Sequence, residues 1–158
     1  MRGLPANQSE AGLVVVAVDG TEAALASLEW AVAWARLGRH PLRGLFIWDA
    51  GWPDFIGNDW QSSQGARQGF LDHVQQAVAR QQTLAQAQFQ QMVGDLPWAE
   101  FLAQSGDPLT LLLAWASDPQ VALLVLGRRT FQVCGRPSLV AIPGQIVKRA
   151  SRPLMVLP

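Results

Sequence analysis

The sequence predicts a single α/β domain built on an open five-stranded parallel sheet with helices on both faces. Short apolar runs alternate with longer amphipathic stretches along the 158 residues, which is the rhythm of βαβ units. The first run, Leu13 to Val18, is continuously apolar and mostly β-branched, as expected for a strand buried on both faces. Strands separated by helices connect through right-handed crossovers and therefore lie parallel.

The first unit continues from this strand to Gly38. Asp19 and Gly20 form the expected turn, and Thr21 stands at the expected helix N-cap. Apolar residues then recur at spacings of three or four, which predicts a helix of about four turns with Gly38 as its C-terminal stop. These residues are Ala24, Leu25, Leu28, Val32 and Ala35.

The second unit begins with the apolar run 42–48, the predicted second strand. Residues 49–69 are rich in Gly, Pro, Asn and Ser and are predicted as an irregular loop, a type that is usually functional or mobile at this length. An amphipathic helix over 70–92 follows, with eight glutamines between 75 and 91 on its polar side. A weaker strand over 97–104 comes next.

The last units begin at Gly106-Asp107-Pro108, a turn that starts a helix with proline in its favoured first-turn position. The apolar run 121–126 ends at Gly127, residues 142–150 are predicted as a helix, and 153–157 as the closing strand. Ligands of such sheets bind beyond the carboxyl ends of the strands, where the strand order reverses. The turn at Asp19 and the end of the fourth strand at Gly127 are therefore predicted to face a ligand.

Composition narrows the function classes. The formal net charge is zero, whereas a nucleic-acid or anionic-membrane partner favours a basic surplus. No apolar run approaches the ~18 residues of a membrane span. Residues 1–11 contain no apolar signal-peptide core. They are predicted as a disordered leader before a domain over 12–158. Cys134 is the only cysteine, which favours a reducing compartment. We expect a cytoplasmic protein with no nucleic-acid or membrane partner.

Four segments in this order and spacing resemble the universal stress protein family over nearly the whole chain. They are Val18-Asp19-Gly20-Thr21, Gly106-Asp107-Pro108, Leu124-Val125-Leu126-Gly127-Arg128 and the closing Ala150-x-x-Pro153-Leu154-Met155-Val156. The resemblance implies a Rossmann-like, adenine nucleotide alpha hydrolase-like fold with strand order 3-2-1-4-5. It also implies a homodimer joined through the C-terminal strand, and the apolar edge of that strand needs covering.

The resemblance further implies an adenine-nucleotide site. Asp19, Ala17 and Ile47 would line the base, Gly127 would lie at the ribose, and the adjacent Val18 and Arg128 belong to the same site.

Many members of the family bind ATP through a loop of the form G-x-x-G, nine residues, then Gly followed by Ser or Thr. Gly127 matches the first glycine, but Thr130 stands at the second, and Val140 and Ala141 stand at the Gly-Ser/Thr pair. Valine adds a branched side chain where phosphates approach the backbone, and alanine removes a hydroxyl. The phosphate loop is therefore predicted to be degenerate.

Three functions remain open. The favoured one is a homodimeric stress-response or regulatory module without enzymatic activity or a required cofactor, which binds ATP weakly or not at all and acts on an unidentified regulatory protein. The alternative is an adenine-nucleotide-binding protein that takes ATP or AMP through Asp19, Gly127 and the loop arginines Arg128, Arg129 and Arg136. The third is an enzyme acting on another small molecule, although no Walker A, nucleophile-elbow or zinc spacing is present. Asp19 has a purely structural interpretation as well, because an aspartate there can tighten the turn.

Overall fold

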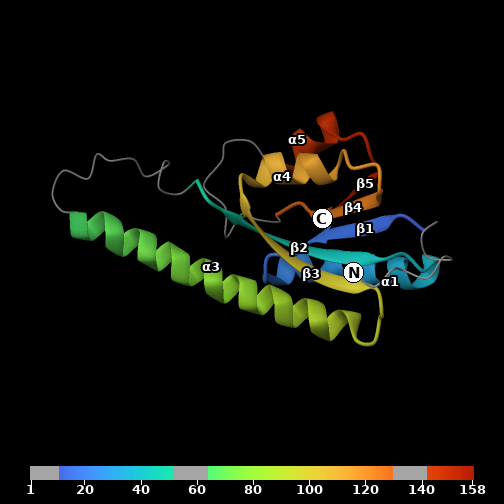
Figure 1. Ribbon diagram of the computed structural model, residues 1–158, viewed down its shortest axis with the longest axis horizontal. Helices are drawn as coiled ribbons and strands as arrows, with labels where there is room; N and C mark the ends of the chain where they lie inside the picture. The colour runs from blue at the N-terminus through green and yellow to red at the C-terminus, as the bar shows by residue number, and fades with distance from the viewer. Residues whose placement is uncertain (1–10, 52–63, 130–141) are drawn as a thin grey trace.

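The fold is described by a computed structural model that covers residues 11–51, 64–129 and 142–158. Strands and helices alternate along these residues (Figure 1). The elements are β1 (Leu13–Ala17), α1 (Glu22–Gly38), β2 (Leu42–Asp49), α3 (Gln64–Val93), β3 (Ala99–Gly106), α4 (Pro108–Trp115), β4 (Val121–Gly127), α5 (Ile142–Arg149) and β5 (Leu154–Leu157).

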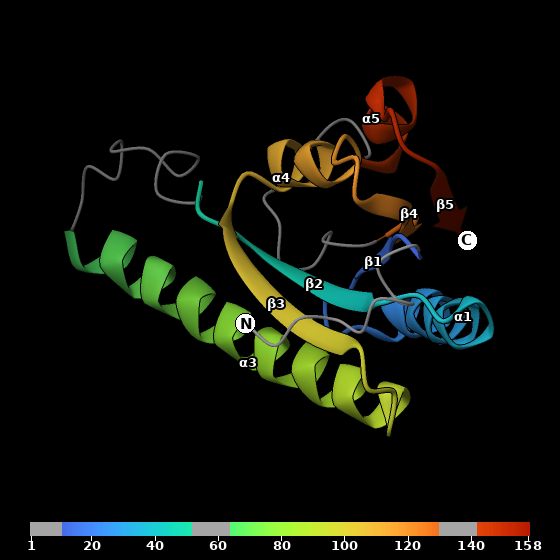
Figure 2. The same cartoon turned by 45° about the vertical axis from the view of Figure 1, so that its right-hand side comes forward.

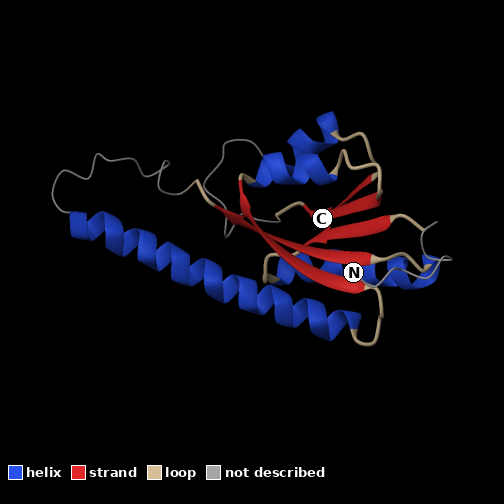
Figure 3. Cartoon of the chain, viewed as in Figure 1, coloured by secondary structure: helices blue, strands red, loops and turns tan. Residues whose placement is uncertain are grey.

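The five strands form one parallel sheet in the order β3-β2-β1-β4-β5, which confirms the predicted fold class and strand order. Helices α1 and α3 lie on one face of the sheet, and α4 and α5 lie on the other (Figure 3). The helices that precede β3 lie on one face of the sheet, and α4, which connects β3 to β4, lies on the other. Strand β4 then pairs with β1 on the side opposite to β2, so the strand order reverses between β1 and β4.

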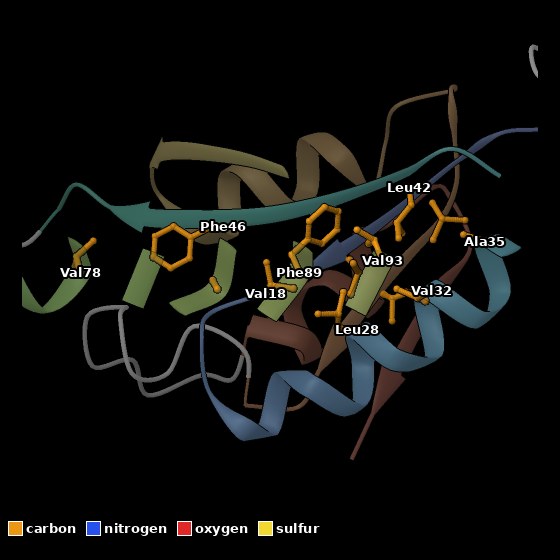
Figure 4. Packing of buried hydrophobic residues seen from close by; sticks show 14 residues of the cluster. Val18, Leu28, Val32, Ala35, Leu42, Phe46, Val78, Phe89 and Val93 are labelled. Carbon is orange, nitrogen blue, oxygen red and sulfur yellow. The ribbon is translucent and has the colours of Figure 1, made fainter. Parts of the chain in front are cut away.

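Two apolar cores flank the sheet, and β1 contributes to both. Val14, Val16 and Val18 pack toward α1 and α3, while Val15 and Ala17 pack toward α4 and α5. The alternation follows from the two-residue repeat of a strand. Figure 4 shows the first core, in which Phe46 and Phe89 lie between β2 and the helices. The apolar run of β1 is thus explained, because Val14 to Ala17 are buried on both faces of the strand.

Helix α3 begins at Gln64, six residues before the predicted start at Phe70, so the predicted loop over 49–69 is wrong for its last part. Gly65 and Gly69 made this segment resemble a loop, because glycine is a poor helix former. Once a helix is nucleated, however, each added residue gains a backbone hydrogen bond. Residues 52–63 of the predicted loop lie outside the described residues. Strand β3 starts at Ala99, two residues later than predicted.

Helix α1 ends at Gly38 as predicted, but the left-handed residue is Arg39, with φ 54°. Gly38 instead makes space for the neighbouring His40 ring. A Cβ at position 38 would lie 2.5 Å from Cδ2 of His40. Glycine at this position therefore leaves room for the imidazole to fold back over the helix end.

Two further expectations concern the predicted N-terminal leader and membrane-spanning helices. Residues 1–10, nearly all of the predicted leader, lie outside the described residues. Within the described ranges, no helix combines the length and the apolar character that a membrane span requires.

Candidate functional site

The candidate site lies at the carboxyl edge of the sheet, where β1 and β4 run side by side. Val16 pairs with Val125, and the pairing of β1 with β2 extends one residue further, because the Val18 amide donates to the Leu45 carbonyl at 2.9 Å. Helix α1 then leaves toward one face of the sheet, while the chain after β4 leads to α5 on the other face (Figure 2). The turn after β1 and Gly127 at the end of β4 therefore lie at the same edge, as predicted.

Asp19 is completely buried at this edge. Its Oδ1 accepts hydrogen bonds from the Thr21 amide at 3.0 Å and from the Thr21 hydroxyl at 2.6 Å. This arrangement is an Asx turn, in which an aspartate organises the backbone two residues ahead. Thr21 occupies the N-cap position of α1 as predicted, but its side chain does not cap the helix. The contacts of Asp19 thus match the structural interpretation of this residue.

Helix α3 packs directly against the same turn. Gly20 has φ 81°, and a Cβ added to it would lie 2.7 Å from the backbone oxygen of Gln81. The Gln88 side-chain amide donates to the Gly20 carbonyl at 3.2 Å. Oε1 of Gln81 is also buried beside this turn and has no hydrogen-bond partner among the residues that the structure describes.

The sequence interpretation missed both glutamines, although a signal was present. Positions 81 and 88 are seven residues apart in a helix, and such positions lie on one face. Two glutamines at that spacing, on the side of α3 where Ala85 is buried, indicate a polar contact with the sheet rather than a solvent-exposed surface.

Two residues expected to line the base, Ala17 and Ile47, and the adjacent Val18 are parts of the two cores. Ala17 and Ile47 have exposed fractions of 0% and 1%, and both pack in the cluster that includes Leu112 and Ile146. Val18 belongs to the cluster on the opposite face. The structure therefore brings Ala17 and Ile47 together but directs Val18 away from them.

The phosphate side of the predicted site begins at Gly127, which is buried at the end of β4. The Arg128 amide donates to the Leu157 carbonyl at 2.8 Å, so this N–H extends the pairing of β4 with β5. The side chains of Arg128 and Arg129 are exposed. Thr130, Val140 and Ala141, together with Arg136, lie outside the described residues.

Two more aspartates lie at this carboxyl edge. Asp49 ends β2 with an exposed fraction of only 3%, and its Oδ1 accepts from the Gly51 amide at 2.9 Å. Oδ2 of Asp107 accepts from the Thr110 amide at 2.9 Å and caps α4. Asp49 was not among the predicted site residues, although an aspartate two residues before a glycine is a recognisable turn signal.

Each of these three carboxylates therefore organises a turn or a helix start. Among the residues that the structure describes, no three His, Cys, Asp or Glu side chains form a group able to hold a metal ion.

Comparison with known proteins finds similarity in structure only. No protein-family model and no curated protein sequence matches the chain. Among solved structures, the universal stress protein UspA from Lactobacillus plantarum superposes with a TM-score of 0.68 at 23% identity, covering 93% of this chain and 97% of its own. A universal stress protein in complex with cAMP gives a TM-score of 0.63 at 15% identity, with the same coverage of both chains. The universal stress protein from Archaeoglobus fulgidus in complex with dAMP gives 0.58 at 13%, covering 94% of this chain and 98% of its own.

These likenesses show that the chain has the fold of the universal stress proteins, over nearly the full length of both partners in each comparison. The fold expected from the resemblance is thereby confirmed. Two of these neighbours are complexes with adenine mononucleotides.

Proposed function

We propose that this chain is a homodimeric regulatory module with the universal stress protein fold, and that it binds ATP weakly or not at all. The observation that carries the proposal is the state of Asp19. Its carboxylate is completely buried and already accepts two hydrogen bonds from Thr21. A base that used this oxygen would have to replace those bonds, so the net gain from the new contact would be small.

Two further observations support weak binding. Ala17 and Ile47 are buried in the α4/α5 core, so a base could reach them only by displacing packed apolar side chains. The sequence at Thr130, Val140 and Ala141 departs from the glycine and hydroxyl pattern of the ATP loop. The residues expected around the base and those expected around the phosphates thus both support weak binding of ATP.

Isothermal titration with ATP and magnesium tests this proposal, with GTP as the matched ligand control. We expect no binding in the low-micromolar range, and low-micromolar affinity for ATP would refute the proposal. The triple variant Thr130→Gly, Val140→Gly, Ala141→Ser separates the two causes. A gain in ATP affinity assigns the weakness to the phosphate loop, whereas no gain assigns it to the buried residues around the base.

A second candidate function is binding of an adenine nucleotide with a single phosphate. The exposed guanidinium groups of Arg128 and Arg129 favour it, because they follow the end of β4 and could bind a phosphate in place of missing amides. Neighbours in complex with cAMP and dAMP support the same ligand class.

Thermal shift with AMP, cAMP and dAMP tests the second candidate. We expect each stabilising nucleotide to lose its effect in Arg128→Gln/Arg129→Gln and to keep it in Arg149→Gln. Arg149 is an exposed arginine at the end of α5. The chain enters β5 from there at the amino ends of the strands, away from the carboxyl ends where Arg128 and Arg129 lie. The variant Asp19→Asn keeps an acceptor for Thr21 and so tests ligand contact without removing the turn. If no nucleotide stabilises the wild-type protein, this candidate is wrong.

The homodimer in the proposal is supported by β5. This four-residue strand lies at the edge of the sheet, and all four residues, Leu154 to Leu157, are only half-buried. An apolar sheet edge invites pairing with another strand, and a second β5 would cover it symmetrically. Sedimentation velocity over a concentration series tests the assembly, and a monomer at all micromolar concentrations would refute it.

The proposal includes a domain over residues 12–158, a regulatory protein as the downstream partner, and action in the cytoplasm. The single thiol, Cys134, supports a reducing compartment. Fluorescence imaging of a tagged chain tests the location, and a signal outside the cytoplasm would contradict it.

A further inference from the structure

An aromatic and apolar strip on α1 is exposed where a monomer would be expected to place polar side chains. We define the α1 aromatic flank as Trp30, Trp34 and Leu37, which are spaced four and three residues apart and so share one side of the helix. Trp34 has an exposed fraction of 44% and Leu37 of 85%. Exposed apolar residues that are grouped in this way indicate an interaction surface.

The two tryptophan rings of the flank are held in place before any partner binds. The rings of Trp30 and Trp34 stack with centroids 5.4 Å apart and planes 10° from parallel, and the His40 ring stacks on Trp34 at 6.5 Å. Nδ1 of His40 lies 2.8 Å from the Gly12 carbonyl, which anchors the imidazole at the helix end. The two tryptophans therefore have little side-chain entropy left to lose on binding.

The flank points away from α3. Arg36 donates to the Val93 carbonyl at 2.9 Å and contacts Asp95 at 3.4 Å, so its side of α1 faces the C-terminal end of α3. Two residues along a helix are about 200° apart, and Trp34 therefore lies on the opposite side from Arg36. Figure 2 shows α1 and β5 on the same side of the molecule, with the C-terminal end of α3 beside α1.

The flank and the edge strand border the same apolar core. Trp30 packs against the same core cluster as Leu123 of β4 and Met155 and Leu157 of β5, and all four residues are only partly buried. Apolar side chains of α1 and of β5 are therefore partly exposed around one core on this face of the sheet.

We propose that this surface, formed by the α1 aromatic flank with Met155 and Leu157, contacts a second copy of the chain. The inference rests on the proposed homodimer and adds the region that would supply most of its contact area. A four-residue strand is only ~13 Å long, so pairing of the two β5 strands by itself covers a small area. A stable interface buries about 800 Å² on each partner. Tryptophan side chains bury 150–250 Å² each, so the exposed part of Trp34 and its neighbours can supply area that strand pairing leaves out.

Two-fold symmetry fits this arrangement. If two β5 strands pair antiparallel about a two-fold axis, the elements that border β5 on one face of the sheet approach their own copies on that same face. The α1 flank of one protomer would then face the α1 flank of its partner beneath the continuous sheet. The contact is self-complementary, because both sides are apolar and aromatic.

Sedimentation velocity on the full chain tests the inference, using the variants Leu37→Gln and Trp34→Gln/Leu37→Gln. Both positions are exposed, so the fold should survive, and circular dichroism checks that it does. We expect the dimer dissociation constant to rise by about tenfold or more for each side chain that contributes, since each substitution occurs twice in the interface. The matched control is Leu84→Gln on α3, where the leucine is 52% exposed but lies on another helix, and it should leave the constant unchanged.

The outcomes separate this inference from the homodimer itself. A wild-type dimer whose dissociation constant is unchanged in Trp34→Gln/Leu37→Gln overturns the role of the flank while leaving the homodimer intact. An equal weakening by Leu84→Gln also overturns the role of the flank. A wild-type chain that stays monomeric at all concentrations overturns both proposals together.

Discussion

Replacing Gly20 by alanine tests whether α3 holds the turn at the candidate site. Gly20 has φ 81°, and a left-handed backbone costs an L-residue about 1–2 kcal/mol. The added Cβ would also lie 2.7 Å from the Gln81 carbonyl oxygen and 3.3 Å from the Ala85 amide nitrogen. Because both atoms belong to the backbone of α3, a rotamer change cannot relieve the overlap, and overpacking of this kind costs about 1–3 kcal/mol.

The expected loss of unfolding free energy for Gly20→Ala is therefore about 2–5 kcal/mol, the sum of the two contributions. Urea denaturation followed by circular dichroism at one fixed protein concentration measures it. Gly94→Ala is the matched control, because Gly94 also has a positive φ of 54° but its Cβ would meet nothing closer than 3.7 Å. Only the backbone contribution should remain there. Equal losses in the two variants would refute the close packing of α3 on the turn.

Two further predictions concern single polar groups. Within the described part of the chain, Oγ of Ser27 in α1 is buried and has no hydrogen-bond partner. Ser27→Ala should therefore raise the unfolding free energy by about 1 kcal/mol, whereas Ala31→Ser, at an equally buried position of α1, should lower it. Urea denaturation that reversed these signs would contradict the assignment. Asp107→Ala removes the side-chain cap of α4 and should lower the unfolding free energy by about 1 kcal/mol. Asp107→Asn should retain most of the stability, because asparagine can also cap a helix. Equal losses in both variants would show that the cap does not stabilise α4.

The repeating pattern of the chain predicted the fold well because its signals are local. A run such as Val14 to Val18 is typical of a strand in a parallel sheet that helices cover on both faces, and the right-handed crossover rule limits how the units can follow one another. The start of α3 was the main error. Gly65 and Gly69 weaken the local helical signal, but extension of an existing helix outweighs it.

The candidate site was predicted only in its position. The sequence placed Asp19 and Gly127 at the carboxyl ends of neighbouring strands, and the sheet confirms that shared edge. It left the role of Asp19 open, because an aspartate before a glycine suits a turn as well as a ligand. The hydrogen bonds from Thr21 identify the turn, and they depend on backbone geometry that composition does not encode.

What the sequence determined by itself was therefore the alternation of strands and helices, the direction of the strands, and the edge of the sheet at which Asp19 and Gly127 lie. These properties follow from periodicity and chain connectivity. Only the tertiary structure decided which side chains are available there, because burial is a property of contacts between distant segments. Gln88 reaches Gly20 across 68 residues of sequence, and the exposure of Trp34 depends on which side of α1 the sheet and α3 leave uncovered.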